Sequence, residues 1–228
     1  MIIKRMASPK LWKIVRKAKA RYAIVPRPGP HAKSACLPLG HILRDVLGIA
    51  ENAREARSLL NNRAVKIDGR VRKDMGFPVG LMDVLAVGDK YWRVLPCKRG
   101  LELKPISEAE SRIKLLKVVG KTNVRGKTQL NFHDGRNMLV DKDVYRTSDV
   151  VVYDLVDSTI KGHVQFKRGT LVLIADGINR GKMGRVEDII VLRRSQPNRV
   201  VIRHDKETTE TLKAFAFAIG QDKPLITL

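Results

Sequence analysis

The sequence predicts an α+β protein that is built of several domains and is mostly β. The chain has 228 residues, more than one domain usually needs. Helical patterns are short, whereas turn dipeptides separate short apolar runs over most of the chain. The basic excess is also uneven, and it divides the chain into a strongly basic N-terminal segment and three moderately basic ones.

Net charge limits the classes of partner. Lys and Arg number 45 against 23 Asp and Glu, which gives a net charge of +22. Such a surplus repels itself unless a polyanion supplies counter-charge. No apolar run approaches the ~20 residues of a membrane helix, and the N-terminus lacks the pattern of a secretory signal. Nucleic acid is therefore favoured over an anionic membrane or an acidic protein.

The first segment carries half of the excess. Residues 1–44 hold 11 basic residues and no acid, and the net charges of 45–100, 101–168 and 169–228 are +4, +4 and +3. Ser8 and Pro9 suit the start of a short helix lined by Leu11 and Trp12. The stretch 27–31 (RPGPH) then favours an extended path. We interpret 1–37 as a basic arm that folds onto RNA, with a disordered solubilising tail as the alternative.

Residues 38–60 predict two helices. Leu39, Ile42, Leu43, Val46 and Leu47 follow the spacing of one amphipathic helix. A second helix begins at Asn52, which forms a capping-box pattern with Glu55. In this second helix Arg54, Arg57 and Asn61 share a face away from the apolar residues.

A hairpin and a second strand pair follow these helices. Residues 64–67 (AVKI) alternate as in a strand, Asp68-Gly69 is a type I′ turn signal, and 70–72 (RVR) returns. Strands are also predicted at 84–87 and 90–95, joined through Gly88-Asp89.

From residue 101 the pattern is mainly β. Turn signals at Asp134-Gly135, Asp176-Gly177 and Pro197-Asn198 separate the runs 150–153, 171–175, 186–192 and 199–203. This arrangement is typical of small barrels. One helix is predicted at 107–118, since Ser107 and Glu110 form a second cap-like pair.

Two basic clusters carry the functional prediction. Arg54, Arg57, Arg63, Lys66 and Arg70 combine a helix face with a hairpin, where arginine can hold phosphate oxygens bidentately; the alternative is a solvated helix face. Arg180, Lys182 and Arg185 decorate a glycine-rich loop at 169–186, whose glycines let backbone approach phosphate; a plain tight turn fits equally well. A P-loop is excluded, since three residues rather than four separate Gly177 from Gly181 and Met183 replaces the Ser or Thr.

No catalytic or metal site is predicted. His133-Asp134 is better explained by the turn at Asp134-Gly135, and the other histidines are scattered. Cys36 and Cys97 lack the clustered ligands of a zinc site. We expect inert thiols in a reducing cytosol, with one disulfide as the alternative. With aromatics at 5%, phosphate contact and shape should dominate over base stacking.

Several stretches together resemble a known family. In order they are 4–12 (KRMASPKLW), 27–31 (RPGPH), 54–57 (REAR), 65–69 (VKIDG), 77–84 (FPVGLMDV), 129–137 (QLNFHDGRN) and the glycine loop at 169–186, which resembles a KOW motif. The chain is similar over nearly its whole length to the archaeal and eukaryotic ("e") type of the small-subunit ribosomal protein S-four family. The alanine-rich end at 212–220 departs from the family pattern and leaves the last strand open.

The resemblance implies four segments and a structural role. These are a basic N-terminal extension at 1–37, an S-four-like α/β RNA-binding domain at 38–100, a central β domain at 101–168, and a C-terminal KOW-type small β-barrel at 169–228. The expected partners are small-subunit ribosomal RNA and neighbouring ribosomal proteins, in cytoplasmic ribosomes, with no cofactor, metal, membrane or small-molecule substrate. An RNA-modifying enzyme and a factor that docks through the KOW segment are the competing hypotheses.

Eighteen side chains are predicted to contact RNA. They are Lys4, Arg5, Lys10, Lys13, Arg16, Lys17, Arg27, His31, Arg54, Arg57, Arg63, Lys66, Arg70, Arg72, Arg136, Arg180, Lys182 and Arg185.

Overall fold

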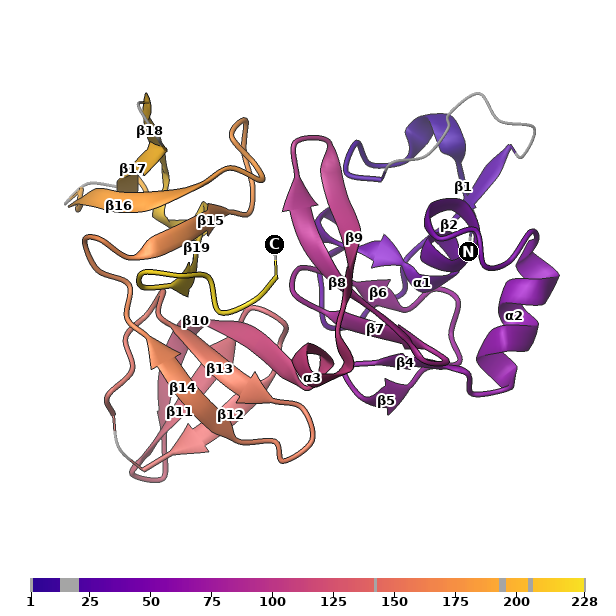
Figure 1. Cartoon of the computed structure of the whole chain (residues 1–228), viewed down its shortest axis with the longest axis horizontal. Coiled ribbons are helices and arrows are strands. Elements are labelled where there is room, and N and C mark those ends of the chain that lie inside the picture. Colours follow the sequence, from indigo (N-terminus) through magenta and orange to yellow (C-terminus); the bar gives the residue numbers. More distant parts are fainter. Residues whose placement is uncertain (1, 13–20, 142, 193–195, 205–206, 228) are drawn as a thin grey trace. The chain divides into compact units, whose positions relative to one another are not determined.

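The computed structural model describes residues 2–12, 21–141, 143–192, 196–204 and 207–227. The chain forms two compact units, one of Met1–Leu95 with Arg99–Arg112 and one of Pro96–Lys98 with Ile113–Leu228. Strands dominate both units and helices are few (Figure 1). The prediction of a mostly β chain is confirmed.

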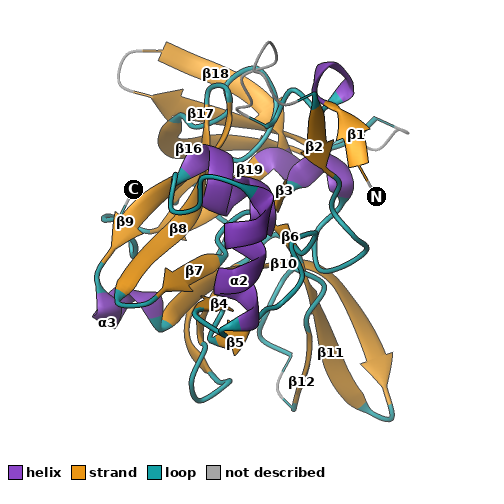
Figure 2. Cartoon of the chain, turned by 90° about the vertical axis from the view of Figure 1, so that its right-hand side faces the viewer, coloured by secondary structure: helices purple, strands orange, loops and turns teal. Residues whose placement is uncertain are grey.

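An antiparallel sheet forms the centre of the first unit (Figure 2). Its strand order is β5-β4-β7-β8-β9. The strands are β4 (Val65–Ile67), β5 (Arg70–Val71), β7 (Val84–Val87), β8 (Lys90–Cys97) and β9 (Gly100–Ile106). Ile67 pairs with Arg70 and Val87 pairs with Lys90, so the predicted turns at Asp68-Gly69 and Gly88-Asp89 are confirmed.

The two predicted helices at 38–60 pack on this sheet with altered geometry. The first is a single turn, α1 (Leu39–His41), that continues as a π-helical segment η3 (Ile42–Val46), and the second is α2 (Ala53–Asn61). Leu39, Ile42 and Leu43 are fully buried, but Val46 is exposed. The wider π turn shifts the apolar face, which moves Val46 out of the predicted stripe.

The described N-terminal residues pack into the first unit. They form β1 (Ile2–Lys4) and β2 (Tyr22–Ile24), which pair with each other, the 3-10 turns Arg5–Ala7 and Lys33–Ala35, and β3 (Leu37–Pro38), which pairs with β6 (Pro78–Val79). Leu11 and Trp12 join the hydrophobic core. Trp12 donates through Nε1 to the Cys36 carbonyl at 2.8 Å and stacks on His41. The remainder of the predicted N-terminal helix lies outside the described residues.

The second unit contains two five-stranded antiparallel sheets. The first has the order β12-β11-β10-β13-β14. Its strands are β10 (Ile113–Val124), β11 (Lys127–Phe132), β12 (Asn137–Val140), β13 (Val150–Asp154) and β14 (Ile160–Val164). The predicted turn at Asp134-Gly135 joins β11 and β12, which are antiparallel neighbours, and is confirmed.

The second sheet has the order β18-β17-β16-β15-β19. Its strands are β15 (Leu171–Ile174), β16 (Met183–Ile190), β17 (Arg199–His204), β18 (Glu207–Leu212) and β19 (Ala216–Gly220), with a 3-10 turn at Lys213–Phe215. The alanine-rich end is thus a strand: β19 is buried throughout and pairs with β15.

The helix predicted at 107–118 is wrong in length. Ser107 does cap a helix, since its Oγ accepts from the Glu110 N–H, but α3 spans only Glu108–Ser111. From Ile113 the chain enters β10, where Lys114 to Lys117 pair with β13. The β-branched residues and the partner strand outweigh the local helix signal.

Two lysines of β10 are buried. Lys114 Nζ lies 3.0 Å from Asp134 Oδ2, and both side chains are almost fully buried. Lys117 Nζ donates to the carbonyls of Lys213, Ala214 and Ala216 at 3.3, 2.7 and 2.7 Å. Burial lowers the pKa of Lys117 to about 8, with the charge of Lys213 contributing. These cations hold the second unit together and are not surface charges.

Candidate nucleic-acid interface

Helix α2 has a fixed N-terminus and presents arginines outward. The Asn52 side chain accepts from the N–H groups of Arg54 and Glu55 at 2.9 and 3.0 Å. Glu55 reaches back to the Glu51 N–H at 2.9 Å, which completes the predicted cap one residue earlier than the simplest capping box. Because Ala56 and Leu60 are fully buried, Arg54 and Arg57 lie on the exposed side.

The chain after α2 extends this basic surface through a tight turn. Arg63 has a positive φ of 57° and is exposed. Lys66 lies between buried Val65 and Ile67, so its side chain points to the opposite side of β4. Asp68 and Gly69 have φ values of 50° and 76°, as a type I′ turn requires, and the turn places Arg70 on β5.

We call Arg54, Arg57, Arg63, Lys66 and Arg70 the α2–β5 surface, after the first and last of the elements that carry them, which are labelled in Figure 2. All five are exposed, and none of their side chains has a hydrogen bond or ion pair with another residue in the described parts of the chain. These five uncompensated charges lie within residues 54–70, with Lys66 on the opposite face of the hairpin from Arg70, and they favour an anionic partner. Four are arginines, whose flat guanidinium groups match phosphate geometry.

Arg72, next to this surface, has a packing role. It is half-buried, and its guanidinium carbon lies 4.4 Å above the centre of the Phe77 ring. This cation–π contact holds the chain just after β5 against Phe77.

Two predicted RNA contacts are buried and have internal partners. Arg5 Nη2 lies 3.0 Å from Asp45 Oδ1, and His31 Nε2 lies 3.0 and 3.1 Å from the two Asp83 oxygens. The His31 side chain is 5% exposed, and a Cβ on Gly80 would lie 2.3 Å from its ring. We therefore assign Arg5 and His31 to the internal structure of the first unit.

The Asp45 carboxylate accepts hydrogen bonds from side chains of two segments of the first unit. Besides Arg5 it accepts from His41 Nδ1 at 2.8 Å and from Arg44 Nη2 at 2.6 Å. Burial by itself raises the pKa of Asp45, but the hydrogen bonds from His41, Arg44 and Arg5 outweigh it and hold the pKa well below its usual range. The ionised carboxylate therefore links residue 5 to the helical segment at neutral pH.

The remaining predicted residues of the N-terminal segment differ in environment. Lys4, Lys10 and Arg27 are exposed, and Arg27 lies 3.2 Å from Asp74. Lys13, Arg16 and Lys17 lie outside the described residues.

The predicted contacts of the second unit all have acidic neighbours. Arg136 pairs with buried Asp134 at 3.0 Å, Arg180 pairs with Asp176, and Arg185 lies 3.5 Å from Asp222. Lys182 is 4.0 Å from Glu207. These acids partly neutralise the cations of the second unit, whereas the cations of the α2–β5 surface have no acidic partner among the described residues.

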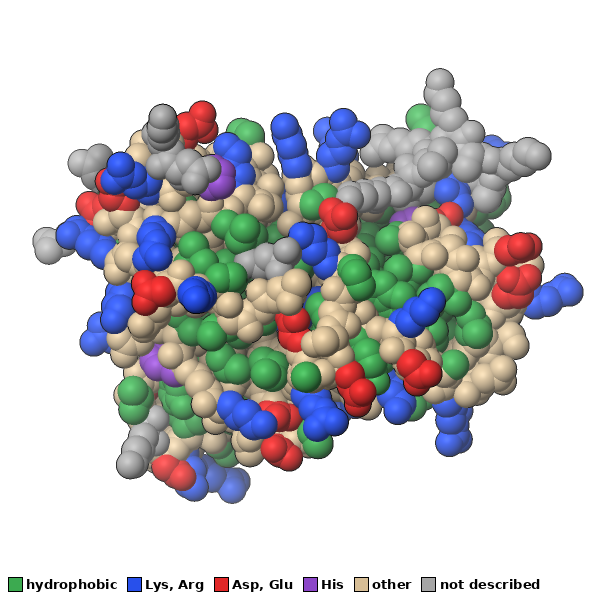
Figure 3. Space-filling view, in the orientation of Figure 1, with side chains coloured by type: hydrophobic (Ala, Val, Ile, Leu, Met, Phe, Trp, Pro, Cys, Tyr) green, Lys and Arg blue, Asp and Glu red, His purple; other side chains and the backbone are tan. Residues whose placement is uncertain are grey.

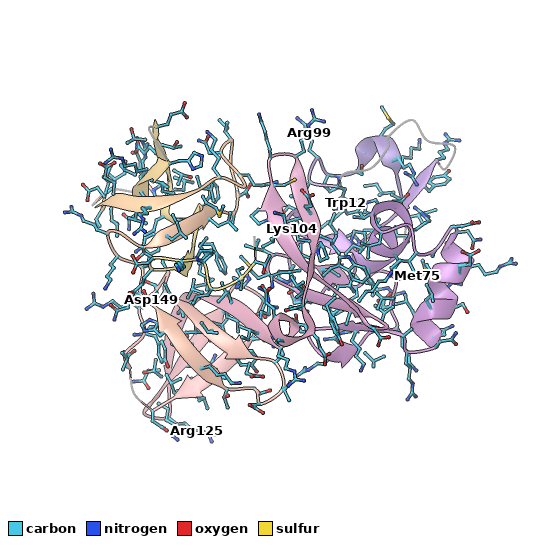
Figure 4. All side chains as sticks on the ribbon, in the orientation of Figure 1. Trp12, Met75, Arg99, Lys104, Arg125 and Asp149 are labelled. Carbon is cyan, nitrogen blue, oxygen red and sulfur yellow. The ribbon has the colours of Figure 1, made fainter. Side chains whose placement is uncertain are left out.

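Basic side chains also cover other parts of the molecule. Figure 3 shows Lys and Arg spread over the visible face with Asp and Glu between them. Arg99 lies at the tip of the β8–β9 hairpin, and Arg125 lies in the turn between β10 and β11 with a φ of 50° (Figure 4). Neither belongs to the predicted set of RNA contacts, although Arg125-Gly126 is a turn dipeptide between two alternating runs.

Other kinds of site find no support in the described parts of the chain. No group of three or more His, Cys, Asp or Glu side chains is placed to hold a metal ion. Neither cysteine forms a disulfide, and burial with the nearby Asp83 charge raises the pKa of the Cys36 thiol to about 11. None of the described helices is both long and apolar enough to span a membrane.

The sequence was compared with models of protein families and with known proteins, and it matches one family over most of its length. Family models match residues 3–34 (RS4NT domain), 42–85 (S4 domain) and 88–160 (ribosomal family S4e). The small ribosomal subunit protein eS4 of Methanothermobacter thermautotrophicus is 44% identical over 99% of this chain and 95% of its own length. The chain belongs to the ribosomal S4e family.

Further relatives of the S4e family extend the match. The eS4 protein of Aeropyrum pernix is 40% identical over 99% of this chain and 94% of its own. The crystal structure of the 30S ribosomal protein S4e from Thermoplasma acidophilum superposes with a TM-score of 0.73 at 28% identity, covering 82% of this chain and 96% of that one. The S4 domain match at 42–85 includes every residue of the α2–β5 surface.

Proposed function

We propose that this chain is a structural, non-catalytic constituent of the small ribosomal subunit that binds and stabilises small-subunit ribosomal RNA. The observation that carries the proposal is the α2–β5 surface, five exposed cations without internal partners on a segment that matches the S4 domain. Relatives that this chain matches over 99% of its length are named as small ribosomal subunit proteins. The protein therefore acts in cytoplasmic ribosomes during translation and subunit assembly.

The domain layout proposed here has four parts. Residues 1–37 form a basic extension, 38–100 an S-four-like RNA-binding domain, 101–168 a central β domain and 169–228 a KOW-type small barrel. Support comes from the S4 match and from the two separate sheets of the second unit, which fall on either side of residue 168.

Several basic surfaces on one chain act together. Once one surface binds the RNA, the others are held near it, so modest affinities combine. The proposed contacts are the α2–β5 surface, the exposed Lys4, Lys10 and Arg27, the loop residues Arg180, Lys182 and Arg185, and Arg72, Arg136, Lys13, Arg16 and Lys17. Neighbouring ribosomal proteins complete the surroundings.

Sedimentation with stoichiometry tests this proposal. A tagged chain expressed in an archaeal host should co-sediment with the small subunit at moderate salt, at about one copy per subunit RNA, and should be released as salt is raised. A translation factor would be recovered far below one copy per subunit. Migration at the top of the gradient would contradict the proposal.

A further inference from the structure

A pocket of the second unit combines an apolar floor with two arginines. Its volume is about 440 Å³, and it is lined by Leu171, Met183, Gly184, Arg185, Arg203, His204 and Pro224. This volume lies within the ~300–1,000 Å³ typical of small-ligand sites. The predicted RNA contacts include Arg185 but not Arg203.

The two arginines are direct cross-strand partners. Arg185 of β16 pairs with Arg203 of β17, and the same row continues to Leu171 on one side and Thr208 on the other. Like charges directly opposite each other in a sheet are destabilising, and this row contains no acid. Repulsion between the two guanidinium groups therefore destabilises this part of the sheet, and a bound anion would relieve it.

The backbone holds this arginine pair in place. A Cβ on Gly184 would lie 2.4 Å from the Arg203 carbonyl oxygen, so the absence of a side chain lets β16 and β17 approach closely. His204 contacts the Met183 carbonyl and closes one side. The arginine pair is thus built on two neighbouring strands, while the floor adds Leu171 of β15 and Pro224 of the segment after β19.

Internal neutralisation of the pair is weak and one-sided. Arg185 Nη1 is 3.5 Å from Asp222 Oδ1, whose side chain is 88% exposed. Its guanidinium also donates long hydrogen bonds of 3.4 Å to the carbonyls of Gly169 and Asp222, which carry no full charge. The Arg203 side chain, itself exposed, has no hydrogen bond or ion pair with any other residue that the structure describes. Arg203 is therefore available to an external anion.

We propose that this pocket binds one unpaired nucleotide of RNA, with its base on the Leu171–Met183–Pro224 floor and its phosphate between Arg185 and Arg203. The inference rests on the proposed function and assigns it a second, separate contact. A carboxylate of an acidic peptide would satisfy the arginines but leave the apolar floor in water, whereas a nucleotide covers both. Arginine also stacks on bases through its flat guanidinium. A paired base would have to leave its stack first, at a cost of a few kcal/mol, so a bulged nucleotide is favoured.

The test compares two hairpin RNAs on the full-length chain. They are identical except that one carries a single bulged 4-thiouridine, and their affinities are measured by fluorescence anisotropy. The wild type should bind the bulged hairpin about tenfold more tightly, the contribution of roughly one charge-assisted hydrogen bond. Arg203→Gln and the uncharged floor variant Met183→Gln should lose this preference and still bind the paired hairpin.

Arg199→Gln is the matched control. Arg199 is also exposed on β17, lies on the same face four residues away, and pairs with Glu210 outside the pocket. It should keep the full preference for the bulge. Circular dichroism checks that every variant is folded, and irradiation should crosslink the 4-thiouridine to peptides that contain Met183 or His204.

The possible results separate this inference from the proposed function. Equal binding of both hairpins, with crosslinks only elsewhere, would overturn the pocket and leave the RNA-binding function standing. Binding of neither hairpin by a chain that still co-sediments with the small subunit would overturn the pocket alone, and failure in both assays would overturn both. Displacement of the bulged hairpin from the pocket by hexaglutamate, at concentrations that leave the paired hairpin bound, would show an acidic protein segment as the occupant.

Discussion

At the scale of single residues, charge alone does not tell which cations face solvent. Lys114 is fully buried against Asp134. Burial by itself raises the pKa of Asp134, but the nearby Lys114 and His133 and the hydrogen bonds from Lys114 and the Arg136 N–H lower it below its usual value. The pair is therefore ionised in the core, where each charge depends on the other.

Removal of one member of this pair should be costly. Lys114→Met removes the buried partner of the Asp134 carboxylate, and Arg136 still compensates part of its charge. We therefore expect the free energy of unfolding to fall by ~3 kcal/mol, the lower end of the cost of breaking a buried ion pair. The double variant Lys114→Met with Asp134→Asn should lose less than the single variant, because no buried charge is left uncompensated. Urea denaturation measures both. A single variant as stable as the wild type would contradict an ionised pair.

Asp45 predicts a pH dependence of stability. The pKa of Asp45 is lower in the folded chain than in the unfolded chain. The ionised carboxylate therefore stabilises the fold above about pH 4, and this stabilisation is lost as the pH falls towards the pKa of the folded chain. Asp45→Asn should therefore be less stable than the wild type at pH 7, and the gap should narrow below about pH 4. Thermal unfolding across pH checks this, and a constant gap down to pH 2 would contradict it.

At the scale of elements, the cap of α2 holds the proposed RNA-binding helix. Asn52 satisfies two N–H groups of the first turn, so Asn52→Ala should lower the free energy of unfolding by ~1 kcal/mol, whereas Asn52→Asp should keep most of it. Chemical denaturation of the three proteins measures the difference. Equal losses for Ala and Asp would show that the cap is not responsible.

Elements set by short-range chemistry could be predicted from sequence. The cap at Asn52 and the turn at Asp68-Gly69 depend on residues within four positions of each other. The helix at 107–118 failed because β10 depends on pairing with β13, about forty residues later. The burial of Trp12, which bonds to Cys36 and joins the core, likewise comes from contacts that no local pattern contains.

In the candidate site, too, features set by neighbouring residues could be predicted and features set by distant contacts could not. The α2–β5 surface could be predicted because its helix period and its hairpin turn are local signals. The internal roles of Arg5 and His31 could not, since their partners Asp45 and Asp83 lie 40 and 52 residues away. Arg203 was missed because its position opposite Arg185 depends on strand register, which includes a β-bulge.

At the level of the whole molecule, the basic side chains behind the net charge of +22 differ in whether an acid compensates them. Some cations are neutralised inside the fold, as Lys114 is, or by acids on the surface, as Arg180 is. The others, above all those of the α2–β5 surface, have no partner among the described residues. Only the second group should release counterions from RNA in large measure, so salt dependence reports which cations touch phosphate.

The salt dependence of RNA binding shows whether the α2–β5 surface contacts phosphate. Affinity for small-subunit ribosomal RNA is measured against salt concentration for the wild type, for Arg54→Ala with Arg57→Ala, and for the charge-matched control Arg112→Ala with Lys127→Ala, whose cations pair with Glu108 and Asp141. We expect the α2 double variant to bind more weakly and to lose about two from the slope of log affinity against log salt, while the control keeps the wild-type slope. An α2 double variant with the wild-type affinity and slope would show that Arg54 and Arg57 do not contact the RNA.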